Sequence, residues 1–365
     1  MATKKNASHP AARGNAHAPT SSGAALLKPI NLALQGGGSH GAFTWGVIDR
    51  LLEDGRIGID SISATSAGAM NAVAVAYGSI HGPDGARQAL QNFWKAVSDS
   101  AGRYNPMVRL GVPPMVRDNP VLQNLLSQWF NAVTHAFAPQ QLNPLRINPL
   151  RDLLLQQIDF DQMNRASQIR LFLAATNVRS GKVRVFGIGE PITADMVLAS
   201  ACLPQLFPAV EVDGEHYWDG GFMGNPVLFP LFYHADSRDV LIVHINPIVR
   251  RDMPTSAEDI LDRVNEITFN SSLIKELRAV HFVQKLMDDG WIKDEYIAKL
   301  RYVLMHSLRS DDVLTDLPVN SKMRSDWEFL TMLRDRGRAA AGAWLEAHFD
   351  KIGVQSSVDL RHEFL

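Results

Sequence analysis

Cysteine is almost absent from this sequence, since Cys202 is the only one among 365 residues. A single cysteine cannot form a disulfide within the chain, and it cannot build a cysteine-based zinc site. This scarcity fits a reducing compartment. Cys202 lies within an apolar run, so we expect it to fill space in the core as a small hydrophobic residue.

An excess of charge of either sign is also missing. Lys and Arg total 36 and Asp and Glu total 38, which gives a formal net charge of −2 at pH 7. This balance gives no global electrostatic reason to expect nucleic acid as a partner. No apolar stretch approaches the roughly twenty residues of a membrane span, and no signal-peptide core is visible. We expect a protein of the cytoplasm or of the periphery of a membrane.

Acidic residues are missing from the first 29 positions, which contain Ala, Ser, Pro and Gly together with the basic residues Lys4, Lys5, Arg13 and Lys28. A segment of this composition without hydrophobic periodicity predicts a flexible basic tail over residues 1–29. The whole chain is 46% hydrophobic, which is enough for one substantial core. No internal repeat of fixed period is present.

Strand and helix patterns alternate after the tail, which favours an α/β fold. The expected strands are 30–34, 57–64, 169–176, 183–188, 210–212, 216–218 and 240–245. Residues 105–139 are apolar and poor in charge, and they predict a cap over one domain spanning 30–250. From residue 256 onward the spacing of apolar residues is almost wholly helical, so 251–365 is expected to be a helical C-terminal extension.

Ser66 is the first candidate for chemistry. It lies in Ala64-Thr65-Ser66-Ala67-Gly68, where a strand pattern ends and an alanine-rich helix pattern begins. A turn tight enough to push a serine hydroxyl into a cleft leaves space only for small residues two positions before and after the serine. The pentapeptide therefore indicates a nucleophile elbow. A plain helix N-cap has the same local pattern, so this motif alone leaves both interpretations open.

A second candidate is the run Gly36-Gly37-Gly38, which ends the first strand and is followed by Ser39, His40 and Gly41. Backbone amides at such a strand-to-helix junction suit either a phosphate or the oxyanion of ester hydrolysis. Gly36, Gly38 and Gly41 also match the dinucleotide pattern G-x-G-x-x-G. That fold expects an acid at the end of the second strand, where this chain has Ser66. A nucleotide-binding oxidoreductase stays as the less favoured alternative.

Asp219 is the third candidate. It precedes Gly220 and Gly221 at the end of a predicted hairpin strand, and Asn225-Pro226 follows. An aspartate before two glycines has an unhindered carboxylate, although Asp-Gly is also common turn chemistry. His216 is close in sequence, but on a short strand it is expected to face away from Asp219.

Together the three motifs resemble the patatin-like phospholipases. GGGSHG is followed about 30 residues later by ATSAG and about 150 residues after that by DGG, in that order. Residues 175–177 and 199–208 resemble segments that lie between those motifs in the family. The likeness covers about residues 30–250.

The resemblance implies a three-layer α/β/α fold with a central, mostly parallel sheet, and a serine hydrolase with a Ser/Asp dyad. Ser66 is the matched nucleophile, Asp219 the matched base, and Gly36, Gly37 and Gly38 the oxyanion hole. The expected substrate is a lipid ester, met at a membrane or lipid surface. No metal or other cofactor is expected, and the oligomeric state is left open.

Two positions depart from the family pattern. His40 stands where Arg or Lys is frequent, so any charge beside the glycine loop is expected to fade above roughly pH 6.5 unless His40 merely caps or packs. Ala64 stands where Gly is usual, which keeps open a non-catalytic, patatin-like lipid-binding scaffold. Gly41, Gly68, Gly220 and Gly221 are expected to support the three motifs.

Overall fold

The computed structural model describes residues 27–104, 148–204, 206–250, 253–297, 300–314, 317 and 319–364. The predicted cap at 105–139 and all but the last three residues of the predicted tail lie outside these ranges.

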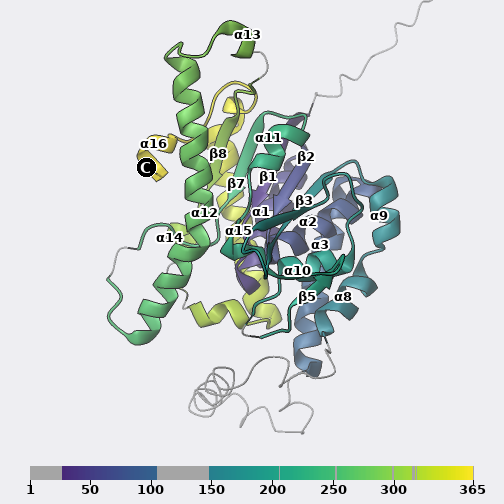
Figure 1. The fold of residues 1–365 in the computed structure, drawn as a ribbon. Coiled ribbons are helices and arrows are strands. Elements are labelled where there is room, and N and C mark those ends of the chain that lie inside the picture. The colour runs from purple at the N-terminus through teal and green to yellow at the C-terminus, as the bar shows by residue number, and fades with distance from the viewer. Residues whose placement is uncertain are drawn as a thin grey trace, which may run out of the picture.

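A mixed, mostly parallel sheet forms the centre of the molecule (Figure 1). Its path runs β5-β6-β3-β2-β1-β7-β8, and β4 pairs with β3 beside this path. The pairs β1–β2, β1–β7, β2–β3 and β7–β8 are parallel, whereas β4, β5 and β6 add antiparallel pairs at one end. The strands are β1 Lys28–Leu34, β2 Ile57–Ala64, β3 Arg170–Asn177, β4 Val183–Phe186, β5 Val210–Val212, β6 Glu215–Asp219, β7 Asp239–Val243 and β8 Leu304–Leu308.

Helices cover both faces of this sheet. The α-helices are α1 Gly41–Asp54, α2 Ala67–Gly78, α3 Gly82–Tyr104, α8 Pro149–Gln157, α9 Phe160–Ala166, α10 Ala194–Ser200, α11 Phe229–His234, α12 Ala257–Asp288, α13 Asp294–Ile297, α14 Asp311–Leu314, α15 Trp327–His348 and α16 Leu360–Phe364. Short 3-10 helices are η1 Gly38–His40, η2 Ser79–His81, η3 Gly220–Phe222, η4 Val319–Met323 and η5 Phe349–Lys351.

The alternation of side chains along each strand explains the layers. Leu32 and Leu34 of β1 join a core cluster with α1, α2, α3 and α15, whereas Ala33 between them joins a second cluster with α11, α12 and α16. Successive strand residues point to opposite faces, so a strand that is apolar throughout must be covered on both sides. The expected three-layer α/β/α fold is therefore confirmed.

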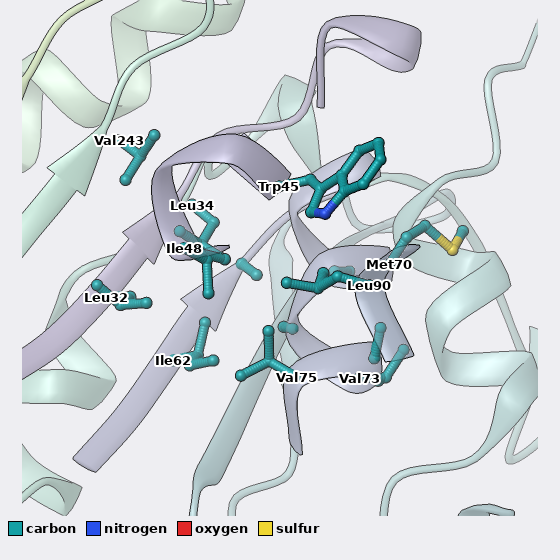
Figure 2. Packing of buried hydrophobic residues seen from close by; sticks show 14 of the residues in the cluster. Leu32, Leu34, Trp45, Ile48, Ile62, Met70, Val73, Val75, Leu90 and Val243 are labelled. Atoms are coloured by element: carbon teal, nitrogen blue, oxygen red, sulfur yellow. The ribbon is translucent and has the colours of Figure 1, made fainter. Parts of the chain in front are cut away.

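The larger core cluster lies between the sheet and α1, α2 and α3. Figure 2 shows Leu32, Leu34 and Ile62 of the strands directed toward Ile48 of α1 and Val75 of α2. Each of these side chains is fully buried. Burial of this kind contributes about 1.5–3 kcal/mol for each large aliphatic side chain, which makes this layer the main anchor of the strand ends that carry the predicted site.

The C-terminal region differs from the expected helical extension, because it supplies a strand to the central sheet. β8 pairs in parallel with β7, from Asp239 opposite Leu304 to Val243 opposite Leu308. His306 and Ser307 interrupt the apolar pattern of β8, which hid this strand from sequence reasoning. The predicted helical C-terminal region is present, but it also contains β8, which sequence reasoning did not find; the boundary at residue 250 stays a prediction.

Helix α15 joins the C-terminal region to the first half of the domain. It crosses α1 at close range, because a Cβ on Gly46 would lie 1.9 Å from the carbonyl oxygen of Arg334 and one on Gly337 would lie 2.0 Å from that of Phe43. Only glycine allows this approach. The backbones of α1 and α15 are thereby held against each other just beyond the glycine loop.

Candidate active site

Ser66 lies in the turn between β2 and α2, with backbone angles φ 55° and ψ −122°. Ser66 and Asp213 are the non-glycine residues with positive φ in the part of the chain that the structure describes. This conformation is rare for a residue with a side chain and is typical of a nucleophile elbow. The turn is fixed by a hydrogen bond from the Ser66 amide to Ser200 Oγ, 3.0 Å away, and by one from Gly68 to the Thr65 carbonyl oxygen.

The small residues around Ser66 are required by the packing of the turn. A Cβ on Gly68 would lie 2.5 Å from the carbonyl oxygen of Leu34, and one on Gly36 would lie 2.5 Å from Cβ of Ser66. Ala64 is fully buried within β2 and keeps its regular pairing with Leu34 of β1. The methyl group of Ala64 is therefore accommodated without any break in the strand.

Asp219 ends β6 and is the N-cap residue of η3, beside the Ser66 turn. β6 pairs with β3, where Asp219 stands opposite Ala175, and β3 pairs with β2. The turn after Asp219 is pressed against these strands, because a Cβ on Gly220 would lie 2.2 Å from the Ala174 carbonyl oxygen. Two parallel strand ends and one antiparallel strand end thus bring Ser66 and Asp219 together, and the Ser66 side chain is close enough to favour the charged form of the Asp219 carboxylate.

The carboxylate of Asp219 is almost completely buried, with 1% of its surface exposed. Burial raises the pKa of Asp219 from 3.8 to about 6, although hydrogen bonds from the Gly221 amide and the Ser66 hydroxyl partly oppose this rise. The Gly221 amide lies 2.7 Å from Oδ1 and fixes the orientation of the carboxyl group. Asp219 is therefore a stronger base than an ordinary aspartate, with a pKa near the working range of a general base.

The glycine loop between β1 and α1 packs against the Ser66 turn through Gly36, but the amides of its three glycines are not equivalent. The Gly36 amide donates to Asn225 Oδ1 at 2.6 Å. Gly37 is extended and Gly38 is left-handed, with φ 58°, and neither amide has a protein acceptor among the residues described. The predicted oxyanion role of Gly36 therefore needs correction, since its amide is already bonded; Gly37 and Gly38 keep theirs as a proposal.

Buried amide side chains hold this loop in place. Gln35 accepts hydrogen bonds from the backbone amides of Ile245 and Asn246, each at 3.0 Å, and donates to Asn270 Oδ1 at 2.9 Å. Asn246 Nδ2 donates to the Gly36 carbonyl oxygen at 2.7 Å. Sequence reasoning gave these residues no role. Their signal was an amide side chain directly after an apolar strand, as in Leu34-Gln35 and Ile245-Asn246.

His40 does not carry the charge that the sequence allowed. Its ring is 3% exposed, Nε2 pairs with Ser321 Oγ at 2.8 Å, and the ring lies 6.4 Å from that of Phe329. Burial, together with the nearby positive charge of Lys322, lowers the pKa of His40 to about 3. His40 is thus neutral near pH 7 and packs between the loop and the C-terminal region. Burial of the ring therefore favours the packing role of His40 over a charge that fades above roughly pH 6.5.

Four other residues that were singled out from the sequence have the following positions in the fold. Gly41 begins α1, and Gly221 lies in η3 after the Asp219 turn. His216 points away from Asp219, toward Glu211 at 3.8 Å, as its place on β6 predicts. Cys202 is 2% exposed in the core, as expected.

Within the described ranges, no group of three or more His, Cys, Asp or Glu side chains has the arrangement of a metal site. None of the helices in those ranges is both long and apolar enough to cross a membrane.

Comparisons with known proteins give the fold a family. A model of the patatin-like phospholipase family matches residues 32–232, which is more than half of the chain and includes all three motifs. Comparison with curated protein sequences finds no match.

Several solved structures resemble the chain at low identity. VipD from Legionella pneumophila shares 16% identity at a TM-score of 0.37, with 84% of this chain and 67% of VipD covered. The type III effector ExoU shares 16% identity at a TM-score of 0.34, with 87% of this chain and 53% of ExoU covered. In the complex of SpcU with ExoU from Pseudomonas aeruginosa the values are 14% and 0.28, with 85% and 53% covered.

This chain spans about half the length of the ExoU chains. The family match extends over β1, the Ser66 turn, β3 and the Asp219 turn, and the sequence-based choice of a hydrolase over a dinucleotide-binding oxidoreductase agrees with it. The chain belongs to the patatin-like phospholipase family.

Proposed function

We propose that this protein is a serine-dependent lipid acyl hydrolase that cleaves carboxylic esters of the phospholipid or lysophospholipid type. The observation that carries the proposal is the position of the buried carboxylate of Asp219 beside the side chain of Ser66, which is held in a strained elbow. Family membership supports the lipid substrate. The amides of Gly37 and Gly38 support acyl chemistry, because they directly follow Gly36, which packs against Ser66, and have no protein acceptor among the described residues.

In the first half of the reaction, Ser66 Oγ attacks the carbonyl carbon of the ester while the carboxylate of Asp219 takes the hydroxyl proton. The carbonyl oxygen becomes an oxyanion, which accepts hydrogen bonds from Gly37 and Gly38. Collapse of this intermediate breaks the bond to the alcohol, and Asp219 returns its proton to the leaving oxygen. An acyl ester on Ser66 and a free lyso-lipid or alcohol remain.

In the second half, Asp219 takes a proton from water, and the resulting nucleophile attacks the acyl carbonyl. The same amides hold the second oxyanion, and its collapse releases a fatty acid and restores Ser66 with the proton from Asp219. The raised pKa of Asp219 suits both halves, since the group must accept a proton and then give it back near neutral pH.

Release of fatty acid from phosphatidylcholine vesicles by the purified full chain tests this proposal. We expect hydrolysis by the wild type and by Ser79→Ala, whose side chain bonds the end of α2 far from the elbow, and none above background by Ser66→Ala. Hydrolysis by Ser66→Ala equal to that of the wild type would contradict the assigned nucleophile. A folded wild type inactive on phospholipid, lysophospholipid and soluble esters would favour the non-catalytic scaffold.

A further inference from the structure

A chain of hydrogen bonds links the C-terminal region to the glycine loop. Lys322 in η4 donates from Nζ to Asn246 Oδ1 at 2.9 Å, and Asn246 donates from Nδ2 to the Gly36 carbonyl oxygen at 2.7 Å. Asn246 is 1% exposed and directly follows the apolar run that continues β7. Both residues lie outside the segment 32–232 that matches the family.

The Gly36 carbonyl group, at which this series of hydrogen bonds ends, belongs to the same peptide unit as the Gly37 amide. A hydrogen bond accepted at the oxygen of an amide polarises its N–H, and successive bonds in a chain strengthen one another. A cation at the far end makes the first bond charge-assisted, which is stronger than a neutral one. The positive charge of Lys322 therefore increases the power of the Gly37 amide to hold a developing oxyanion.

Asn225 holds Gly36 through both its amide and its carbonyl group. Its Oδ1 accepts from the Gly36 amide at 2.6 Å, and its Nδ2 lies 3.4 Å from the Gly36 carbonyl oxygen. With Asn246 on the carbonyl side, the Gly36–Gly37 peptide plane cannot rotate without the loss of buried hydrogen bonds. Such a loss is costly, because the freed groups would have no water to replace their partners.

The backbone of η4 also braces the loop, independently of the lysine side chain. A Cβ on Gly38 would lie 2.4 Å from the carbonyl oxygen of Lys322, and Ser321 bonds the ring of His40. A substitution of the Lys322 side chain leaves this backbone contact in place. It therefore separates the electrostatic contribution of the ammonium group from the packing of η4 against the loop.

We propose that Lys322 and Asn246 are positioning residues that orient and polarise the Gly36–Gly37 peptide for oxyanion binding, an inference that rests on the proposed hydrolase function. The lysine does not touch the substrate in this scheme. Its effect reaches the reacting oxygen through Asn246 and the peptide. The C-terminal region is then part of the working active site, because it supplies Lys322, the cation from which this series of hydrogen bonds starts.

The test uses the full-length protein and p-nitrophenyl butyrate, a soluble neutral ester that has no charged head group and needs no membrane. We expect Lys322→Met to lower kcat about five- to tenfold with KM nearly unchanged, because only the transition state carries the oxyanion. Lys322→Arg should recover most of the loss, because it restores the charge. Lys285→Met, which removes an exposed charge from α12, should leave kcat within about twofold of the wild type.

A double-mutant cycle decides whether the effect passes through Asn246. In an Asn246→Ala background, Lys322→Met should change kcat by no more than about twofold, because the hydrogen-bonded link between Lys322 and the Gly36 carbonyl group is already lost. Rates of Ser66 modification by a fluorophosphonate should follow the same pattern, since the phosphonyl oxygen enters the same oxyanion site. Thermal melting of each variant shows whether the fold is intact, and Lys322→Met alone carries the test if Asn246→Ala unfolds.

Three results would overturn the inference. They are an unchanged kcat in Lys322→Met, a change confined to KM, and a Lys322→Met effect that persists in full when Asn246 is absent. Each of them is compatible with an active wild type, so the proposed function would survive. A wild type that neither hydrolyses esters nor reacts with the fluorophosphonate would instead overturn the proposed function and this inference with it.

Discussion

The buried carboxylate of Asp219 should reduce the stability of the protein at neutral pH. Its pKa rises from 3.8 to about 6, so between these values the folded protein holds a proton that the unfolded chain releases. Stability therefore falls as the pH rises through this window, and the loss is complete above about pH 6. A shift of about two units at about 1.4 kcal/mol per unit corresponds to about 3 kcal/mol.

Replacement of Asp219 by Asn removes the charge but keeps the shape and the oxygen that accepts from the Gly221 amide. We expect Asp219→Asn to raise the free energy of unfolding by up to about 3 kcal/mol at pH 8, and by progressively less as the pH falls toward about 4. Urea unfolding curves at several pH values measure this difference. Asp84→Asn is the matched control: its side chain is 96% exposed, and its effect should stay within about 0.5 kcal/mol at every pH.

Two results would refute this reasoning. If Asp219→Asn were less stable than the wild type at pH 8, burial of the charge would not be the dominant energetic feature of the site. If the difference between the two proteins were the same at pH 5 and pH 8, Asp219 would not titrate between those values in the folded state. The first result would point to hydrogen bonds that only a carboxylate can make, and the second to an ordinary pKa.

Three further predictions concern the site and the domain. Because the base form of Asp219 is required, kcat/KM on a soluble ester should rise about tenfold per pH unit below about pH 6 and level off above it; His40→Ala should keep this profile. Gly68→Ala, whose new Cβ meets a carbonyl oxygen at 2.5 Å, should lower the melting temperature and the activity, whereas Gly58→Ala, with its nearest contact at 3.5 Å, should change neither. Deletion of residues 253–365 removes β8 and α15, and differential scanning calorimetry should show no cooperative transition in the remaining chain.

Much of the fold followed from local sequence patterns. The strands from β1 to β7 coincide with the predicted apolar runs to within two residues, because each run is bounded by glycine or by polar turn residues. β8 was missed, because His306 is buried through hydrogen bonds with Asp239 and Ser357, which no local pattern reveals. Tertiary pairing with β7 decided the conformation of that segment.

The motif residues could be found from sequence, but the arrangement of the loop amides and the protonation of His40 could not. The bond from the Gly36 amide to Asn225 joins residues 189 positions apart. The environment of His40 depends on Ser321 and Lys322, which are more than 280 positions away. Spacing within a motif shows which chemistry is available, whereas long-range burial and hydrogen bonding decide which groups remain free to perform it.

The most direct test of the central claim is modification of the full chain by a fluorophosphonate, with the adduct located by peptide mass spectrometry. The account predicts a single adduct on Ser66, none in Ser66→Ala, and a rate at least about a hundredfold slower in Asp219→Asn, because the asparagine cannot accept the hydroxyl proton. An adduct on another serine, or an unchanged rate in Asp219→Asn, would contradict a nucleophile activated by Asp219.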